Sequence, residues 1–121
     1  MSVSFEGIGE RCVTFCSDPV MGVIPYAPCK LSDNGMVAFA EEDDRFMGWV
    51  VNTVSGYCTV QTEGYVEAIY SGTAPEVGYA YLLSDGEGSV CVDSGTEGVY
   101  TGGEYLIVKV DTTNNIVGFF L

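Results

Sequence analysis

Acidic side chains are the most numerous residues of this sequence that could do chemistry. The 121 residues include 17 Asp and Glu, and their densest run is Glu41 to Asp44. This run could bind a cation or a basic partner, but it has neither the alternating ligands nor the central glycine of a calcium loop. Two carboxylates could hydrolyse a glycoside, yet no spacing favours one pair. We interpret the run as a solvated loop, and we predict no catalytic residue and no metal ligand.

Nucleophiles and bases are also few. The sequence has no histidine, which excludes Ser-His-Asp and Cys-His catalysis and histidine metal sites. No Cys-x-x-Cys occurs, and the odd number of cysteines argues against a disulfide framework. We predict that most cysteines are small buried apolar residues; they are Cys12, Cys16, Cys29, Cys58 and Cys91. Gly7-Ile8-Gly9 lacks the third glycine of a dinucleotide fingerprint, so we predict no cofactor and no enzymatic activity.

Aromatic side chains offer a second kind of chemistry, the stacking of flat rings on sugars. The residues that could form such a surface are Trp49, Tyr57, Tyr65, Tyr70, Tyr79, Tyr81, Tyr100 and Tyr105. Strands use tyrosine heavily as a half-buried residue, however, and Trp49 lies in an apolar stretch that predicts a core position. A carbohydrate-binding module is therefore an alternative function.

Charge restricts the partners. Four Lys and Arg against 17 acids give a formal net charge of −13. Nucleic acids and anionic membranes require cations that this chain lacks, so we expect neither as a partner. A macromolecular partner should be neutral or basic, and self-association would have to be driven by apolar contact. No apolar run is long enough for a transmembrane helix, and residues 1–6 do not resemble a signal peptide, so we expect a cytoplasmic origin.

The sequence pattern predicts that β-strands position the side chains discussed above. Short apolar or alternating segments follow one another between Gly, Asp, Asn and Pro turn signals, without apolar residues at helical spacing. We predict an all-β, single-domain small barrel or sandwich of about nine to ten strands over residues 11–121, preceded by an N-terminal arm or edge strand over residues 1–10. No internal repeat is evident. The predicted strands are residues 11–17, 29–31, 36–40, 46–51, 57–62, 65–70, 79–83, 89–92, 105–110 and 116–121.

The C-terminus is unusually apolar. The chain finishes on Phe119-Phe120-Leu121, with no charged residue after Asp111. Because chain ends are ordinarily mobile and polar, this segment should be paired in a sheet or buried against another subunit. An inert, acidic β-domain with an apolar end is typical of a structural or binding component.

The middle and end of the chain show a characteristic order of segments. The Asp33-Asn34-Gly35 turn leads to Met36-Val37-Ala38, then to the acidic loop and then to Gly48-Trp49-Val50-Val51. Next comes a pair of strands around a glycine, Thr59-Val60-Gln61-Thr62-Glu63-Gly64-Tyr65-Val66-Glu67. The closing strands are Gly78-Tyr79-Ala80-Tyr81-Leu82, Gly88-Ser89-Val90 and Tyr105-Leu106-Ile107-Val108. This order resembles the small capsid decoration, or cement, proteins of tailed bacteriophages. The resemblance covers roughly residues 10–121, and the sequence departs from it in its five cysteines and few basic residues.

The resemblance implies a non-enzymatic β-barrel protein that binds the outer face of an assembled head. Its expected partners are the major capsid protein and further copies of itself, as a trimer, and its expected location is the capsid surface of a virion assembled in the host bacterial cytoplasm. We hypothesise that the N-terminal arm reaches a neighbouring capsid subunit and becomes ordered on binding. The candidate partner-binding residues are Ser2, Val3, Ser4, Phe5 and Glu6.

Overall fold

The computed structural model describes residues 9–121, and its regular structure in that part of the chain consists of ten strands. This confirms the all-β prediction and the predicted number of strands. The strands are β1 (Arg11–Ser17), β2 (Pro28–Asp33), β3 (Met36–Phe39), β4 (Gly48–Val54), β5 (Tyr57–Glu63), β6 (Tyr65–Ser71), β7 (Gly78–Ser84), β8 (Val90–Val92), β9 (Gly103–Asp111) and β10 (Ile116–Phe120). The described residues contain no helix that is long and apolar enough to cross a membrane.

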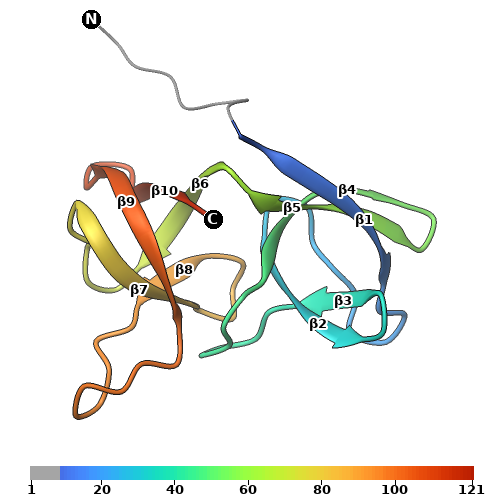
Figure 1. Cartoon of the computed structure of the whole chain (residues 1–121), viewed down its shortest axis with the longest axis horizontal. Coiled ribbons are helices and arrows are strands. Elements are labelled where there is room, and N and C mark those ends of the chain that lie inside the picture. The colour runs from blue at the N-terminus through green and yellow to red at the C-terminus, as the bar shows by residue number, and fades with distance from the viewer. Residues whose placement is uncertain (1–8) are drawn as a thin grey trace, which may run out of the picture.

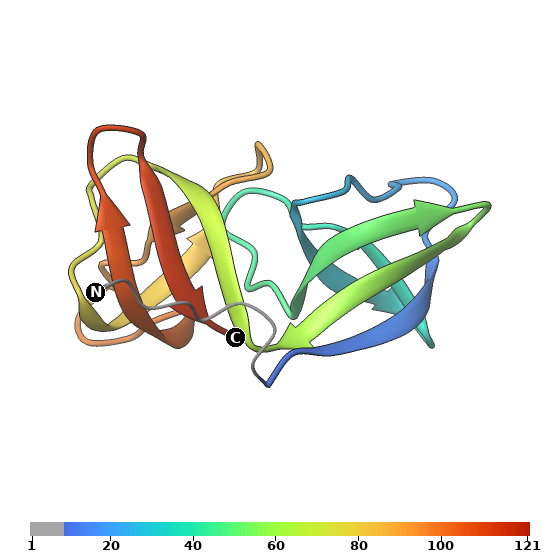
Figure 2. The same ribbon diagram turned by 90° about the horizontal axis from the view of Figure 1, so that it is seen from above.

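The ten strands close into two small barrels that lie side by side (Figures 1 and 2). The first barrel has the strand order β1-β3-β2-β4-β5, and the second has the order β6-β8-β7-β9-β10. In Figure 2, β6 is the strand of the second barrel that faces the first. Closure removes most of the exposed strand edges on which other chains could pair.

The two barrels repeat one topology. In each, the first strand pairs in parallel with the third and antiparallel with the fifth. The register Ser17↔Val37 of the first barrel corresponds to Tyr70↔Val90 of the second, and both valines are fully buried. Each fourth strand also carries one extra residue against the fifth: Val51 in β4 and Val108 in β9.

The repeat is therefore one of structure and is not evident in the sequence. The two halves share topology and register, but few identical residues occupy equivalent positions. Two of the exceptions are the Tyr26-Ala27 and Tyr79-Ala80 pairs, which precede or begin the equivalent strands β2 and β7. Buried valines and turn glycines satisfy the same backbone demands in both halves without producing a repeated motif.

A sharp corner between β5 and β6 takes the chain from one barrel to the other. Gly64 occupies this corner with a φ of 99°, and a Cβ there would lie 2.9 Å from the Cα atom of Glu10. The buried side chain of Gln61 braces the corner, since its Nε2 donates hydrogen bonds to the carbonyls of Glu63 at 3.1 Å and Tyr65 at 3.0 Å. At position 64, the positive φ and the close approach to Glu10 both require glycine.

Side chains from the first barrel's half of the chain complete the core of the second barrel. Phe46 and Trp49 are 2% and 5% exposed, and both contact Phe119 of β10 with ring centroids 6.2 Å apart. Phe46 also stacks on Tyr105 of β9 at 5.2 Å. The prediction that Trp49 is a core residue is confirmed. This larger apolar cluster packs the two barrels against each other, while a second, smaller cluster fills the first barrel; it consists of Cys29, Val37, Val50, Cys58 and Val60.

The C-terminal strand is paired within the chain itself. β10 lies between β6 and β9, and Val117 and Phe119 are fully buried. Of the two explanations considered for the apolar end, pairing in a sheet is confirmed.

Candidate functional site

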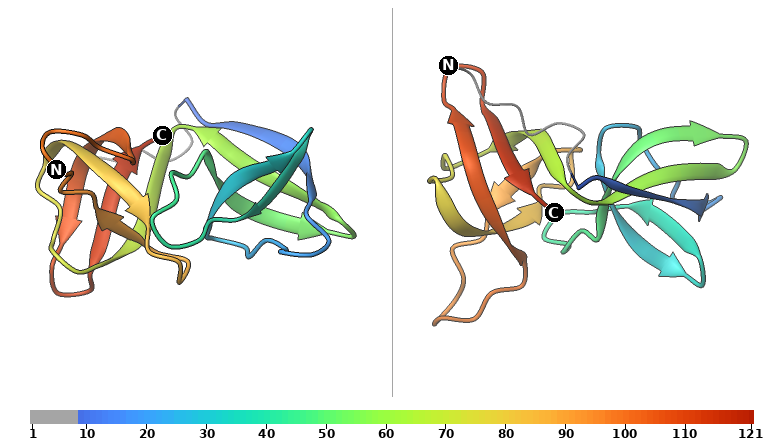
Figure 3. Two further views of the ribbon diagram at one scale, coloured as in Figure 1. Left: turned by 90° about the horizontal axis from the view of Figure 1, so that it is seen from below. Right: turned by 45° about the horizontal axis from the view of Figure 1, so that its top comes forward.

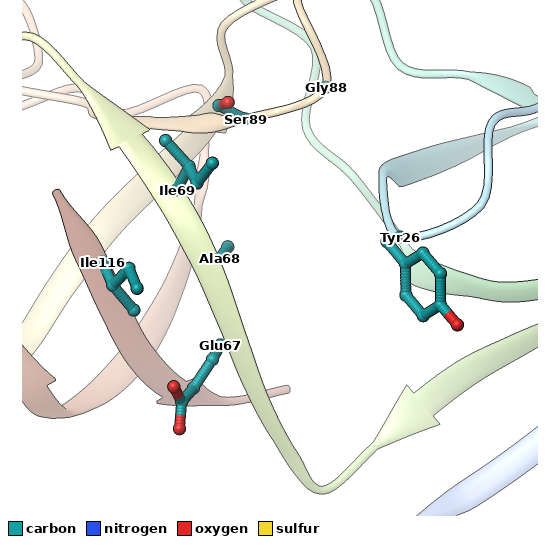
Figure 4. A pocket seen from close by; sticks show the side chains of 7 residues that line it. All are labelled: Tyr26, Glu67, Ala68, Ile69, Gly88, Ser89 and Ile116. Carbon is teal, nitrogen blue, oxygen red and sulfur yellow. The ribbon is translucent and has the colours of Figure 1, made fainter. Parts of the chain in front are cut away.

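A slot lies between the two barrels. It has a volume of about 240 Å³ and lies along β6, as Figure 4 shows. Tyr26, from the loop between β1 and β2, stands on the side of the first barrel, across the gap from β6. The slot is lined by Tyr26, Glu67, Ala68, Ile69, Gly88, Ser89 and Ile116.

One wall of the slot is a free strand edge. The N–H of Tyr70 donates to the carbonyl of Asn115, on the β10 side, at 3.0 Å. Since backbone groups of an antiparallel strand alternate between its two neighbours, those of Glu67 and Ile69 point to the opposite side, toward the slot. There β8 pairs only with Tyr70 and Ser71. Within residues 9–121, no strand pairs with the slot side of β6 before Tyr70.

The equivalent position in the first barrel is closed. There Cys16, the counterpart of Ile69, donates its N–H to the carbonyl of Gly35 at 2.9 Å. Gly35 occupies the place that Gly88 has in the second barrel, and both have positive φ. Among the described residues no bond joins the Ile69 N–H to Gly88. Within residues 9–121, the second barrel therefore departs from the first by leaving this N–H without a backbone partner.

Tyr26 is held over the slot in an unfavourable backbone conformation. Its φ is 62°, whereas its repeat counterpart Tyr79 lies in the regular strand β7. The Tyr26 N–H donates to the carbonyl of Val50 at 2.6 Å, and the side chain is 77% exposed. A left-handed conformation at a bulky residue costs on the order of 1–3 kcal/mol and is concentrated at functional sites. The strained backbone at Tyr26 is held by this pairing with Val50, and its aromatic ring borders the slot and is open to solvent.

The hairpin on the other side of the slot is fixed by Asp85. Its Oδ1 accepts hydrogen bonds from the N–H groups of Glu87 at 2.8 Å and Ser89 at 3.0 Å. Its Oδ2 accepts one from the Ser71 hydroxyl at 2.9 Å, which ties the hairpin to the end of β6. The slot is thus bounded by ordered backbone on this side.

The described residues that line the slot carry one charged side chain, Glu67. Its carboxylate accepts a hydrogen bond from the Tyr65 hydroxyl at 3.0 Å and forms an ion pair with the Lys109 ammonium at 3.6 Å. None of these described lining residues is basic. Together with the net charge of −13, this favours a neutral or basic ligand.

The acidic run Glu41 to Asp44 lies at the seam between the barrels rather than at the slot. Lys30 binds Asp44 at 2.7 Å and Glu41 at 3.3 Å. The hydrogen bond from Lys30 lowers the pKa of Asp44, and the same contact raises the pKa of Lys30. The backbone of Asp43 and Asp44 pairs with Ser84 of β7 in both directions at 3.0 Å. Most side chains of the run are solvated, as predicted, and its backbone joins the barrels.

The residues predicted to stack on sugars do not form one surface. Trp49, Tyr65 and Tyr70 are buried in the core. Tyr81 and Tyr100 stack on each other at 3.9 Å, at the base of the loop between β8 and β9, which projects away from the first barrel (Figure 3). Glu104 raises the pKa of Tyr81. Only Tyr57 and Tyr79 of the predicted set remain more than half exposed.

Two further predictions have different outcomes. The arm residues Ser2, Val3, Ser4, Phe5 and Glu6 lie outside the described residues, so their role stays a prediction. Of the cysteines, Cys29 and Cys58 are buried, Cys91 is half-buried, and Cys12 and Cys16 are exposed on β1. The prediction of burial thus fails at β1, whose outward-facing alternate positions carry these two thiols.

Sequence reasoning missed the slot. Tyr26 was visible as an aromatic between Pro25 and Pro28, in a segment that could not be a central strand. The free edge of β6 had no signal, because it depends on how far β8 extends along its neighbour. No protein-family model matches the chain, and a comparison with curated proteins gives no significant match.

Proposed function

We propose that this chain is a non-catalytic structural protein that binds the outer surface of an assembled tailed-phage head and stabilises it. The observation that carries the proposal is the apolar cluster in which side chains from both halves of the chain pack together. A protein that holds capsid subunits together against internal pressure needs rigidity and contact area rather than reactive groups. The fused double barrel meets this need.

The segment order that resembles decoration proteins supports the same function. Its most distinctive part, Thr59 to Glu67, forms the end of β5, the Gly64 corner and the start of β6. In this chain that segment connects the two barrels and also supplies one wall of the slot. One of the resembling segments therefore joins the two halves, and its last residue, Glu67, lines the slot.

The proposed partners are the major capsid protein and further copies of this chain, arranged as a trimer on the head. Symmetric attachment at several points strengthens binding without strong individual contacts. Because each copy carries a charge of −13, copies repel one another in solution, and the head surface must supply neutral or basic contacts.

Co-sedimentation with heads tests the proposal. Purified chain is mixed with heads that lack it, assembled from the major capsid protein encoded in the same genome. We expect saturable binding and a higher temperature of head disruption, with bound copies in multiples of three. Albumin, which is also acidic, serves as the control. Absence of binding above the albumin level would contradict the proposal.

The exposed ring of Tyr26 beside the slot favours a second candidate, a carbohydrate-binding module. Flat aromatic rings at the mouth of a cavity can stack on sugar rings. A titration with a panel of neutral oligosaccharides separates the two functions. Binding is monitored through the NMR amide signals of Ile69 and Ser89. Shifts of these signals at submillimolar sugar, together with no binding to heads, would favour the carbohydrate module.

A further inference from the structure

We propose that the slot binds an extended, neutral or basic peptide segment of a partner protein, which adds to β6 as a further strand. The inference rests on the slot geometry and goes beyond the assignment to phage heads. It concerns how the chain recognises a partner, whatever larger structure that partner belongs to.

The free backbone groups decide the chemical class of the ligand. The N–H and C=O of Glu67 and the N–H of Ile69 lie on the slot side of β6, where the described chain provides no strand partner. Another polypeptide backbone offers acceptors and donors at the matching spacing, which is the basis of strand addition. The carbonyl of Tyr65, just before them, already accepts a bond from Gln61, so the free edge begins at Glu67.

The walls of the slot favour an apolar side chain between them. Ile69 is 58% exposed although it lies in the middle of a strand, and Tyr26 is 77% exposed across the gap. With Ile116 of β10, these side chains provide apolar surface on both sides of an added strand. Covering these apolar side chains would remove their surface from water, which favours binding.

Charge selects the occupant. Glu67, which is paired with Lys109 on β9, lines the slot, and Glu87 lies in the adjoining hairpin, whereas none of the described lining residues is Lys or Arg. A second copy of the chain is strongly acidic. Residues 1–8 of the chain itself contain Glu6 and no Lys or Arg. A neutral or basic segment of another protein is the occupant with complementary charge.

The primary test uses a peptide probe, acetyl-Lys-Val-Thr-Val-Lys-amide, with amide signals of the full chain recorded by NMR. We expect shifts concentrated at Glu67, Ile69 and Ser89, and slower hydrogen exchange of the Glu67 and Ile69 amides. The acidic analogue with Glu in place of both lysines should bind about tenfold more weakly or worse. Equal affinity for both peptides, or shifts that avoid β6, would overturn the proposal.

Two modifications, one in the probe and one in the protein, test the backbone hydrogen bonds between the probe and β6. In the probe, methylation of the central backbone nitrogens should abolish binding, and this needs no change to the protein. In the chain, Ile69→Pro removes an N–H on the free edge and should weaken binding about tenfold, while Ile69→Val should bind normally. Thr14→Pro, on the matching free side of β1, is the control and should leave binding unchanged. Undiminished binding of the methylated probe would contradict strand addition.

Two further measurements test whether another segment competes with the probe for the slot. Deletion of residues 1–8 should leave the affinity of the probe unchanged. A large gain in affinity on deletion would show that the chain's own arm fills the slot, which would overturn the proposal. An affinity that falls as protein concentration rises would show that a second copy fills it, with the same consequence.

Discussion

At the scale of single residues, Phe46 has the clearest structural role. It is fully packed between Trp49, Tyr105 and Phe119, although it belongs to a connection between two strands of the first barrel. The Tyr105 hydroxyl also donates to its carbonyl at 3.3 Å. One side chain thus connects three elements from both halves of the chain.

Truncation of this side chain should therefore be costly. We expect Phe46→Ala to lower the free energy of unfolding by about 3–5 kcal/mol, because it leaves a cavity at the junction. Denaturant unfolding followed by the fluorescence of Trp49, the one tryptophan, measures the change. Val20→Ala is the control at a 91% exposed position and should change stability by less than about 0.5 kcal/mol. A loss below 1 kcal/mol for Phe46→Ala, on the order of an exposed-site change, would contradict the shared core.

The cysteines provide a second residue-scale prediction. Burial, with a smaller contribution from Cys58, raises the pKa of Cys29 to about 12. Because the thiolate is the reactive form, a thiol reagent at pH 8 should modify Cys12 and Cys16 quickly, Cys91 more slowly, and Cys29 and Cys58 only after unfolding. Mass spectrometry of the labelled peptides identifies the order. Early labelling of Cys29 would contradict the first-barrel core.

The same pKa shift predicts a pH dependence of stability. The folded state keeps the Cys29 proton up to about pH 12, whereas an unfolded thiol loses it near 9. Folded stability should therefore be fully present below pH 9 and should decline as pH rises from 9 toward 12. Cys29→Ala should reduce this decline. An identical alkaline decline in both proteins would exclude the thiol as its cause.

At the scale of elements, the sequence predicted most of the strands but not how the strands pair with one another. The strand that contains Val13 and Phe15 was predicted with its observed bounds, since alternation and the Asp18-Pro19 turn are local signals. The closure of the strands into two barrels was not predictable, because it depends on the Gly64 corner and on pairing between distant segments. For the same reason the slot was missed, as it lies where β8 is too short to cover β6.

The loop between β8 and β9 is organised by one carboxylate. Asp93 accepts hydrogen bonds from the N–H groups of Gly95 at 2.9 Å, Thr101 at 2.8 Å and Gly102 at 2.9 Å. These hydrogen bonds lower the pKa of Asp93, and the bond from Gly102 makes the largest contribution. The loop bends away from the barrel and returns with Tyr100 stacked on Tyr81 (Figure 3).

Acid should loosen this loop. Because the pKa of Asp93 is lowered in the folded state, its contribution to stability is present above the ordinary Asp pKa, about 3.9, and is lost as pH falls through the folded pKa. The amide signals of Thr101 and Gly102 should shift only at that lower pH, and Asp93→Ala should shift them at neutral pH. Asp111→Ala, at another turn, is the control. Titration of these amides at the ordinary Asp value would contradict the assignment.

At the scale of the whole molecule, the two barrels should behave as one cooperative unit. The cluster around Phe119 includes Phe46 and Trp49, so the second barrel has no complete core without the first half of the chain, and the backbone of Asp43 and Asp44 also pairs with Ser84. We expect a single unfolding transition that coincides by Trp49 fluorescence and far-ultraviolet circular dichroism. Fragment 65–121, which lacks Phe46 and Trp49, should not fold on its own. Two separated transitions would show that the barrels are independent.

Our account depends most directly on the free edge of β6, and backbone hydrogen exchange of the dilute, unliganded full chain measures it residue by residue. The amides of Val66 and Ala68 face β10, so they should exchange slowly. The amides of Glu67 and Ile69 face the slot and should exchange faster by several orders of magnitude, although they lie in the same strand. Equally slow exchange at all four positions would show that the edge is already covered and would contradict the account.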